Sequence, residues 1–363
     1  YVSALADDVP ALSSVGWFAR RLIDMESRTR LRHLSEWIQT ASDRMDVDDV
    51  VAKAAGMLDR VSGDRSDAVA DGAALADTLW QSLTTETIAA PSVGDPDLDE
   101  LFSPALGGVG RLTVIAARAG MGKTALVLNL LLRLARRGVG VALLSMEQPV
   151  EQVVKRLCAM DGCAPFSKLD SRPPGMHPEA WHGPREWERI HEHIEFMSTA
   201  PFFIDDKPGQ SLAYIRSRLV RLAARAKRSG VPLRCVGVDY IQRAKCPGEN
   251  RPEALATFCQ GLADLARELR VSVLALSQFN RAIDGRGPSA MPRMSDLAGS
   301  SGIENASDVI YGLARPGRFT PEPDNVIRVD CLKNRHGQDG QRFNLEWRGS
   351  HLQIGGRTAA GST

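Results

Sequence analysis

The chain has 363 residues, a length that suits about two domains of roughly 150 residues each. Hydrophobic residues make up 43% and charged residues 25%, as in ordinary globular proteins, and the formal net charge is +1. This balance excludes nucleic-acid binding through overall charge, so any DNA-binding surface must be a local patch. No apolar run approaches the roughly 20 residues that cross a bilayer, and no signal peptide is visible. We therefore expect a cytoplasmic protein with no membrane contact.

The six cysteines also indicate a cytoplasmic protein. None belongs to a C-x-x-C pair, and no Cys/His cluster has the spacing of a zinc site. We expect buried, reduced thiols, as in proteins of a reducing compartment.

The N-terminal part of the chain has apolar residues at helical spacing. Ser14 is placed to cap a long helix, and a second amphipathic helix follows, so we expect a helical hairpin over residues 1–63. Residues 64–97 are predicted to be a linker that contains a short apolar helix at about 73–83. Such a short helix cannot bury its apolar face alone, so it should dock on another surface.

From Leu112 onward, short Val/Ile/Leu runs alternate with helical segments. This pattern indicates a mostly parallel sheet with helices on both faces, which is a doubly wound α/β fold over residues 98–356, followed by a frayed tail at 357–363. Ser211 should cap a helix that ends at Gly230. The predicted strands are Leu112–Ala117, Val141–Met146, Phe202–Ile204, Leu233–Val238, Val271–Leu276, Val309–Leu313 and Val326–Leu332.

A glycine-containing loop after the first predicted strand has the character of a phosphate-binding loop. Backbone N–H groups that point into such a loop, at the start of a helix, suit a triphosphate. Lys123 would contact the outer phosphates, and the Thr124 hydroxyl would ligate Mg²⁺. Ala117 stands where the general pattern has glycine, so the alternative is a turn with a chance Gly-Lys-Thr. The candidate nucleotide-binding residues here are Ala119, Gly120, Met121, Gly122, Lys123, Thr124 and Ala125.

Polar residues end three other predicted strands. Asp239 would lie at the carboxyl edge of the sheet beside the loop, where it can hold Mg²⁺ through water. Glu147 can orient the attacking water and accept its proton, although an exposed loop glutamate would look the same. Gln278 can bond the γ-phosphate and respond to its loss, or it is simply a polar strand end.

Two cations, Lys333 and Arg335, follow the last predicted strand. Because they are two positions apart, they lie on the same face of an extended segment. Within one subunit they look like ordinary surface charges. In a ring they could act on a neighbouring subunit's nucleotide, with the arginine stabilising the charge of the transition state.

Taken in order, these segments resemble the DnaB-type replicative helicase family over nearly the whole chain. The resemblance implies a RecA-like motor domain, preceded by a remnant of the family's N-terminal domain and a linker helix that docks on the neighbouring subunit. The matching motifs are Ala117-Arg118-Ala119-Gly120-Met121-Gly122-Lys123-Thr124, Ser145-Met146-Glu147-Gln148-Pro149, Val238-Asp239-Tyr240-Ile241-Gln242, Ala275-Leu276-Ser277-Gln278-Phe279-Asn280-Arg281 and Lys333-Asn334-Arg335-His336-Gly337.

The resemblance also implies an activity and partners. The chain would be one subunit of a homohexameric, ATP-dependent DNA helicase that uses ATP and Mg²⁺ and moves 5′ to 3′ on single-stranded DNA at the replication fork. Primase and a helicase loader are further expected partners. Lys333 and Arg335 would act in trans, and Arg156 matches an arginine near the nucleotide.

The DNA-binding loop departs from the family pattern. Ala298-Gly299 stands where the family has Arg-Glu. The candidate DNA contacts are therefore the backbone N–H groups of Gly299, Ser300, Ser301 and Gly302, which can hold a phosphate without a side chain, and the side chain of Arg281.

Two other functions remain open at this point. A RecA-type recombinase would share the motor domain, but the predicted hairpin and linker helix argue against it. An NTP-gated DNA-binding or loader ATPase without unwinding activity stays possible because of Ala298-Gly299.

Overall fold

The computed structural model describes residues 28–41, 50, 53–54, 57, 76, 79–80, 90–107, 110–246, 250–280, 283, 286, 291–297, 300–319 and 325–357. The chain divides into two compact units, Tyr1–Thr87 and Ile88–Thr363. In the first unit, residues 28–41 are a helix that buries Leu34 and Ala41. This agrees with the second half of the expected first helix. Most of the expected second helix and of the docking helix lies outside the described residues.

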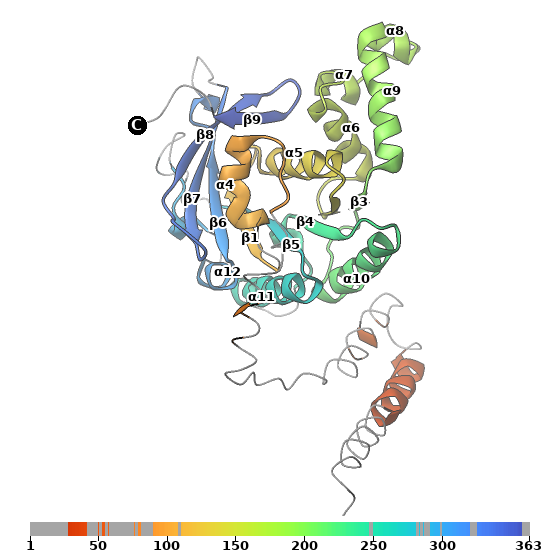
Figure 1. Ribbon diagram of the computed structural model, residues 1–363, viewed down its shortest axis with the longest axis vertical. Helices are drawn as coiled ribbons and strands as arrows, with labels where there is room; N and C mark the ends of the chain where they lie inside the picture. Colours follow the sequence, from red (N-terminus) through yellow and green to blue (C-terminus); the bar gives the residue numbers. More distant parts are fainter. Residues whose placement is uncertain are drawn as a thin grey trace, which may run out of the picture. The chain divides into compact units, whose positions relative to one another are not determined.

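The second unit is built on a nine-stranded sheet (Figure 1). Its strand order is β3-β2-β4-β5-β1-β6-β7-β8-β9, in which the pairs from β3 to β6 are parallel and those from β6 to β9 are antiparallel. The mostly parallel sheet predicted from the sequence is confirmed. The strands are β1 Leu112–Ala117, β2 Gly140–Ser145, β3 Phe202–Asp205, β4 Leu233–Asp239, β5 Ser272–Gln278, β6 Val309–Ala314, β7 Val326–Asn334, β8 Arg342–Arg348 and β9 Gln353–Arg357.

Helices cover both faces of this sheet, as expected for the doubly wound class (Figure 1). The described α-helices are α4 Pro96–Leu106, α5 Lys123–Arg136, α6 Val150–Met160, α7 Phe166–Asp170, α8 Pro178–His182, α9 Pro184–Thr199, α10 Leu212–Arg228, α11 Arg251–Leu269 and α12 Ser300–Ala306. Ser211 caps α10 by accepting a hydrogen bond from the Tyr214 N–H, as predicted. None of the described helices is both long and apolar enough to cross a membrane.

Strand β1 shows why an unbroken apolar run marks a strand at the centre of such a sheet. Ile115 and Ala117 contribute to the core beneath α4, α5 and α6. Val114 and Ala116 contribute to the core beneath α10 and α11. Because successive side chains point to opposite faces and both faces are covered, every position must be apolar or small.

The structure differs from the sequence prediction at a few boundaries. Strand β7 continues through Asn334, two residues beyond the predicted end. Strands β8 and β9 were not predicted. The prediction rested on continuous apolar runs, whereas β8 alternates apolar and polar residues and β9 contains two glycines. Helix α4 begins at Pro96, inside the segment expected to be linker, with Asp95 as its cap.

Candidate functional site

The phosphate-loop candidate joins β1 to α5, and two glycines shape it. Gly120 has φ +73° and Gly122 has φ +97°, a left-handed conformation that residues with a Cβ rarely adopt. Gly122 is the N-cap of α5, so the loop ends at the N-terminus of a 14-residue helix. Lys123 is largely buried, and its ammonium group lies 5.1 Å from the centre of the Tyr240 ring. The loop therefore presents a helix N-terminus and a fixed cation, which together suit a phosphate group.

Thr124 and Asp239 lie next to each other behind this loop. The Thr124 hydroxyl donates a hydrogen bond of 2.9 Å to Asp239 Oδ2. Burial raises the pKa of the Asp239 carboxyl above its ordinary value, while the hydrogen bond from Thr124 and the charge of Lys123 act in the opposite direction. Asp239 Oδ1 is buried and has no hydrogen-bond partner in the described structure. A buried carboxylate oxygen without a partner, beside a hydroxyl, fits the oxygen ligands that Mg²⁺ prefers.

Glu147 lies two residues beyond the end of β2, rather than at the strand's last position. The turn that carries it is held at both ends. The Ser145 hydroxyl donates to the Gln148 carbonyl at 2.6 Å, and the Met146 N–H donates to the Asp239 carbonyl at 2.7 Å. Glu147 itself is exposed. The strand end therefore presents a solvent-accessible carboxylate beside the Asp239 backbone, where it can reach a water molecule.

Gln278 ends β5, directly beside Ala117 at the end of β1. The Gln242 side chain holds this strand end. Its Nε2 donates to the Ser277 hydroxyl at 2.8 Å and to the Gln278 carbonyl at 3.3 Å, and its Oε1 accepts from the Gln278 N–H at 3.2 Å. Gln242 belongs to a motif quoted from the sequence, yet sequence reasoning gave it no role. Its contact with a strand 35 residues away depends on the sheet order.

A pocket of about 350 Å³ gathers these side chains. Met121 is buried under the loop and Asp239 lies behind Thr124, so neither lines it. The sequence-predicted residues that line the pocket are Ala119, Gly120, Gly122, Lys123, Thr124, Ala125, Glu147, Arg156 and Gln278.

Arg156 reaches the pocket from α6. Burial lowers the pKa of its guanidinium, while the charges of Asp239, Asp170 and Glu147 raise it. Its Nε is buried without a hydrogen-bond partner in the described structure. This cation is therefore held near Glu147 at the pocket and near Asp239 behind it, where it can meet a phosphate.

Sequence reasoning missed residues that the antiparallel side of the sheet contributes. Arg315 lines the pocket and stacks over the Trp347 ring at 4.7 Å, and Trp347 also lines it. The guanidinium of Arg318 lies so close to Gly120 that a Cβ there would be 2.4 Å from it. These residues follow the phosphate loop by about 190 residues or more, and no local motif marks them.

The structure does not bring Lys333 and Arg335 to this pocket. β7 is antiparallel to β6, and Lys333 pairs with Ile310 near the start of β6, whereas the pocket lies at the carboxyl ends of the parallel strands. The Lys333 ammonium instead donates to the carbonyls of Glu304 and Ser307, and Arg335 Nη2 donates to the carbonyl of Asn305 at 2.7 Å. Both cations therefore satisfy carbonyls at the C-terminal end of α12.

The DNA-contact candidates are described in part. Arg281 and Gly299 lie outside the described residues. Ser300, Ser301 and Gly302 form the first turn of α12, whose N–H groups have no acceptor within the helix. A Cβ at Gly302 would lie 2.1 Å from that of Ala256, so this glycine also lets α12 pack closely on α11.

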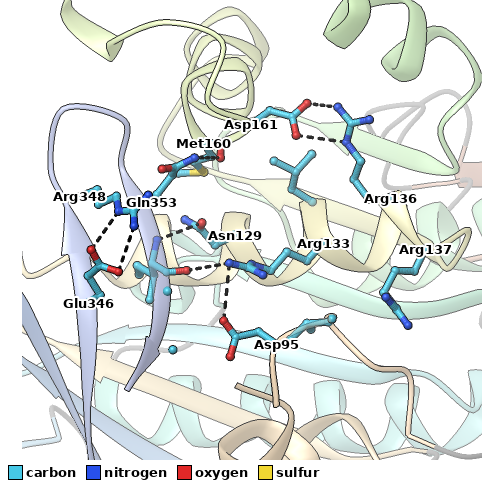
Figure 2. A pocket seen from close by; sticks show the side chains of 16 residues that line it. Asp95, Asn129, Arg133, Arg136, Arg137, Met160, Asp161, Glu346, Arg348 and Gln353 are labelled. Atoms are coloured by element: carbon cyan, nitrogen blue, oxygen red, sulfur yellow. Dashed lines mark hydrogen bonds and ion pairs between the residues drawn. The ribbon is translucent and has the colours of Figure 1, made fainter. Parts of the chain in front are cut away.

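A larger pocket of about 710 Å³ lies elsewhere, between α5, the start of α4 and the β8–β9 hairpin (Figure 2). Its arginines are largely paired: Arg133 with Asp95, Arg136 with Asp161, and Arg348 with Glu346. It contains neither the phosphate loop nor Asp239. The smaller pocket is the better candidate for the nucleotide because the loop, the buried carboxylate and the strand ends meet there.

The loop and the sheet define the class of this protein as a phosphate-loop ATPase with a doubly wound α/β motor domain. The sequence profile of the DnaB-like helicase C-terminal domain matches residues 94–354. The chain belongs to the DnaB-like replicative helicase family, which confirms the resemblance read from its motifs.

Relatives with curated functions agree with this assignment. The replicative DNA helicase DnaB of Geobacillus stearothermophilus is 30% identical over 361 residues, which cover 94% of this chain and 74% of that protein. The replicative DNA helicase DnaC of Bacillus subtilis is 27% identical over 359 residues, with the same two coverages. The chain is accordingly an ATP-hydrolysing replicative DNA helicase.

Solved structures agree on the fold. A DnaB-like replicative helicase, described together with its interactions with primase, aligns with a TM-score of 0.74 and 23% identity over 98% of this chain and 82% of its own. A separately solved ATPase domain aligns with a TM-score of 0.67 and 26% identity, covering 80% of this chain and 100% of that domain.

Proposed function

We propose that this helicase subunit binds ATP with Mg²⁺ in the 350 Å³ pocket at the carboxyl edge of the sheet. The observation that carries the proposal is the Thr124–Asp239 hydrogen bond beside a buried, unpartnered carboxylate oxygen. Thr124 and Asp239 would hold the Mg²⁺, which when bound offsets the charge of the β- and γ-phosphates. Lys123 and the N–H groups at the start of α5 would bind the outer phosphates.

Three other residues have separate tasks in this pocket. Glu147 orients the attacking water and accepts its proton, since it is an accessible carboxylate at a fixed turn. Gln278 hydrogen-bonds the γ-phosphate, so the loss of this phosphate on hydrolysis changes the contacts at the end of β5. Arg156 adds positive charge from α6, where it lies near Glu147 and Asp239.

Lys333 and Arg335 act on the nucleotide of a neighbouring copy. Support comes from their place at the opposite end of the sheet from their own pocket, because an arginine that stabilises the transition state must contact the phosphates. A second copy in a ring offers such a pocket. A homohexamer is the assembly that the family implies, and primase and a helicase loader are the further protein partners we propose.

Single-stranded DNA would pass along the first turn of α12, held by N–H groups of Ser300, Ser301 and Gly302. The sequence predicts further contacts from Gly299 and Arg281. Such contacts go to the phosphate backbone, so binding is independent of sequence and weakens with salt. Lys333 and Arg335 bond the other end of the same helix. A change in their contacts on hydrolysis would therefore move the DNA-holding segment, in the 5′ to 3′ direction that the family implies.

An ATPase and unwinding assay tests the proposed function. Wild-type protein should hydrolyse ATP faster with single-stranded DNA and should unwind a forked duplex. Lys123→Ala and Glu147→Gln should lose both activities, while Glu147→Gln still binds ATP because the phosphate contacts remain. DNA-stimulated hydrolysis without unwinding would favour an NTP-gated DNA-binding ATPase instead. Open filaments rather than closed rings in electron microscopy would favour a recombinase.

A further inference from the structure

A group of cysteine, histidine and aspartate side chains joins α6 to α9, outside the nucleotide pocket. Asp161 caps the end of α6, Cys163 follows it, and His193 lies in α9. One ligand atom from each of the three lies within 4.8 Å of the others. Among the described residues, this is the one group of three such side chains that is close enough to hold a metal ion. The Cys158 thiol lies beside that of Cys163 but outside this group, and it could supply a fourth donor after a change of side-chain rotamer.

The end of α6 brings the two thiols together. Gly162 has φ +80°, and its N–H donates to the Ala159 carbonyl at 2.9 Å. The Cys163 N–H then donates to the Cys158 carbonyl at 3.3 Å, so the chain folds back over the last turn of the helix. His193 is 30 residues further along. The sequence spacing therefore gave no sign of a metal site, and only the fold brings these side chains together.

These four side chains form a donor set that suits Zn²⁺. Two cysteine sulfurs, an imidazole nitrogen and a carboxylate oxygen are all common zinc ligands, and four donors match its tetrahedral preference. Cys163 and His193 are 3% and 4% exposed, so a bound ion would be shielded from water on their side, while Asp161 lines the larger pocket. His193 Nδ1 lies 2.6 Å from Asp161 Oδ2, so these two candidate donor atoms already face each other.

The charges around the group balance a divalent ion. Two thiolates and one carboxylate carry three negative charges, against two positive charges on Zn²⁺. The remaining negative charge is matched by the Arg136 guanidinium, which bonds both oxygens of Asp161 (Figure 2). A buried site of this kind is far less costly when its net charge is close to zero.

The segment that carries the group is held together by polar contacts, such as the Lys168–Glu186 ion pair, and by a small apolar cluster. Its own apolar cluster consists of Cys158, Cys163, Ala164 and Ile190, with Leu169 and Trp187 packed against it. Its helices α7 and α8 have five residues each, and α8 lies at the far tip of the segment (Figure 1). Small elements with little apolar burial commonly depend on a metal or another cross-link.

We propose that Cys158, Asp161, Cys163 and His193 bind one structural Zn²⁺ that ties α6 to α9. This inference does not depend on the roles assigned within the nucleotide pocket. It does have a consequence for that pocket, because Arg156 lies on α6 two residues before Cys158. The ion would fix the end of the helix from which Arg156 reaches the nucleotide.

Two metal-free arrangements compete with this proposal. In the first, Asp161 simply bridges His193 and Arg136, and the Cys163 thiol donates to the Arg189 carbonyl at 3.3 Å. In the second, Cys158 and Cys163 oxidise to a disulfide. Both leave the protein without a stoichiometric metal, so metal content separates them from the zinc site.

The test measures zinc in the full chain, purified without a histidine tag or chelator from cells grown with added zinc. Elemental analysis should give one zinc ion per subunit. Cys163→Ser and His193→Ala should lose most of it, whereas Cys246→Ser, which changes a partly exposed cysteine outside the group, should retain it. Replacing zinc by Co²⁺ should produce a thiolate-to-cobalt charge-transfer band.

The wild-type protein alone decides the outcome, so the test does not require every variant to fold. Zinc far below one ion per subunit, together with no charge-transfer band on Co²⁺ titration, would overturn the proposal. So would thiols at Cys158 and Cys163 that react with an alkylating agent only after reduction, which would indicate the disulfide. If the site is real, a chelator should also lower the melting temperature of wild type but not that of His193→Ala.

Discussion

The Thr124 hydroxyl and the Asp239 carboxylate are joined by a hydrogen bond of 2.9 Å between the first turn of α5 and the last residue of β4. One oxygen of the carboxylate is thereby engaged, and the other is buried without a hydrogen-bond partner among the described residues. Two segments that are 115 residues apart in the sequence thus share a contact at which an oxygen-seeking cation can bind.

Asp239→Asn should therefore abolish Mg²⁺-dependent ATP hydrolysis, with a loss on the order of 10²-fold or more, because an amide lacks the negative charge that a buried cation needs. The measurement is the ATPase rate as a function of Mg²⁺ concentration. Thr124→Ser is the matched control, since it retains the hydroxyl and should keep most of the activity. Wild-type Mg²⁺ dependence in Asp239→Asn would show that this carboxylate does not hold the ion.

Gln242 should act by positioning Gln278. Its side chain makes three hydrogen bonds to the end of β5, and each such bond contributes about 1 kcal/mol net. We expect Gln242→Ala to lower kcat about tenfold, the factor that corresponds to about 1.4 kcal/mol, with little change in the KM for ATP.

Gln242→Glu is the matched control for this effect. It retains the acceptor for the Gln278 N–H but loses the amide donors. Its kcat should therefore lie between the kcat of wild type and that of Gln242→Ala. An equal effect of both substitutions on KM, with kcat unchanged, would contradict a positioning role.

Arg335→Ala should remove hydrolysis from assembled rings while leaving nucleotide binding largely intact. An arginine supplied by a neighbouring subunit commonly accelerates phosphoryl transfer by about 10³-fold or more. Arg335 also bonds the Asn305 carbonyl within its own subunit, so Arg335→Lys is included as a variant that retains the positive charge. Size-exclusion chromatography must show that each variant still assembles.

Mixing subunits gives a sharper measurement of the same role. Arg335→Ala subunits retain an intact phosphate loop, and Lys123→Ala subunits retain Arg335. If pockets are shared between neighbours, a mixture of two inactive variants should recover part of the ATPase activity. No recovery from mixed rings, or normal hydrolysis by Arg335→Ala alone, would place the effect of Arg335 within its own subunit.

The sequence predicted the centre of the sheet better than its antiparallel edge. Runs such as Leu112–Ala117 are apolar throughout because both faces of the strand are buried, and that pattern is visible without a structure. Strand β8 alternates apolar and polar residues over seven positions, so it lacks the continuous apolar run by which the central strands were recognised. The boundary near Lys333 was also harder to predict, because a strand that becomes partly exposed can continue through polar residues.

The part of the pocket that the phosphate loop forms could be predicted from the sequence, and the part that the antiparallel strands contribute could not. Lys123 and Thr124 are recognisable because the loop places its chemistry within a few consecutive residues. Arg315 and Trp347 reach the same pocket only because β6, β7 and β8 lie beside β1 in the order of the sheet. The Cys158, Asp161, Cys163 and His193 group depends likewise on α9 packing against the end of α6.

Tyr311 should contribute to stability through both its ring and its hydroxyl. It is 1% exposed on β6, its hydroxyl donates to the Leu101 carbonyl at 2.5 Å, and its ring meets Phe102 edge-on with centres 5.1 Å apart. Tyr311→Phe removes only the hydrogen bond and should lower the free energy of unfolding of the motor domain by about 1 kcal/mol. Tyr311→Ala also leaves a cavity and should cost about 3–5 kcal/mol.

Urea unfolding, followed by a signal from the motor domain, measures both changes as shifts in the midpoint at constant slope. Neither the hydrogen bond to Leu101 nor the ring contact with Phe102 involves the nucleotide pocket. The KM for ATP of Tyr311→Phe should therefore match that of wild type. Equal midpoints for Tyr311→Phe and wild type would mean that water replaces the hydroxyl as donor to the Leu101 carbonyl without loss of stability. In that case the packing of the ring against Phe102, rather than the hydrogen bond to Leu101, would be what holds α4 on β6.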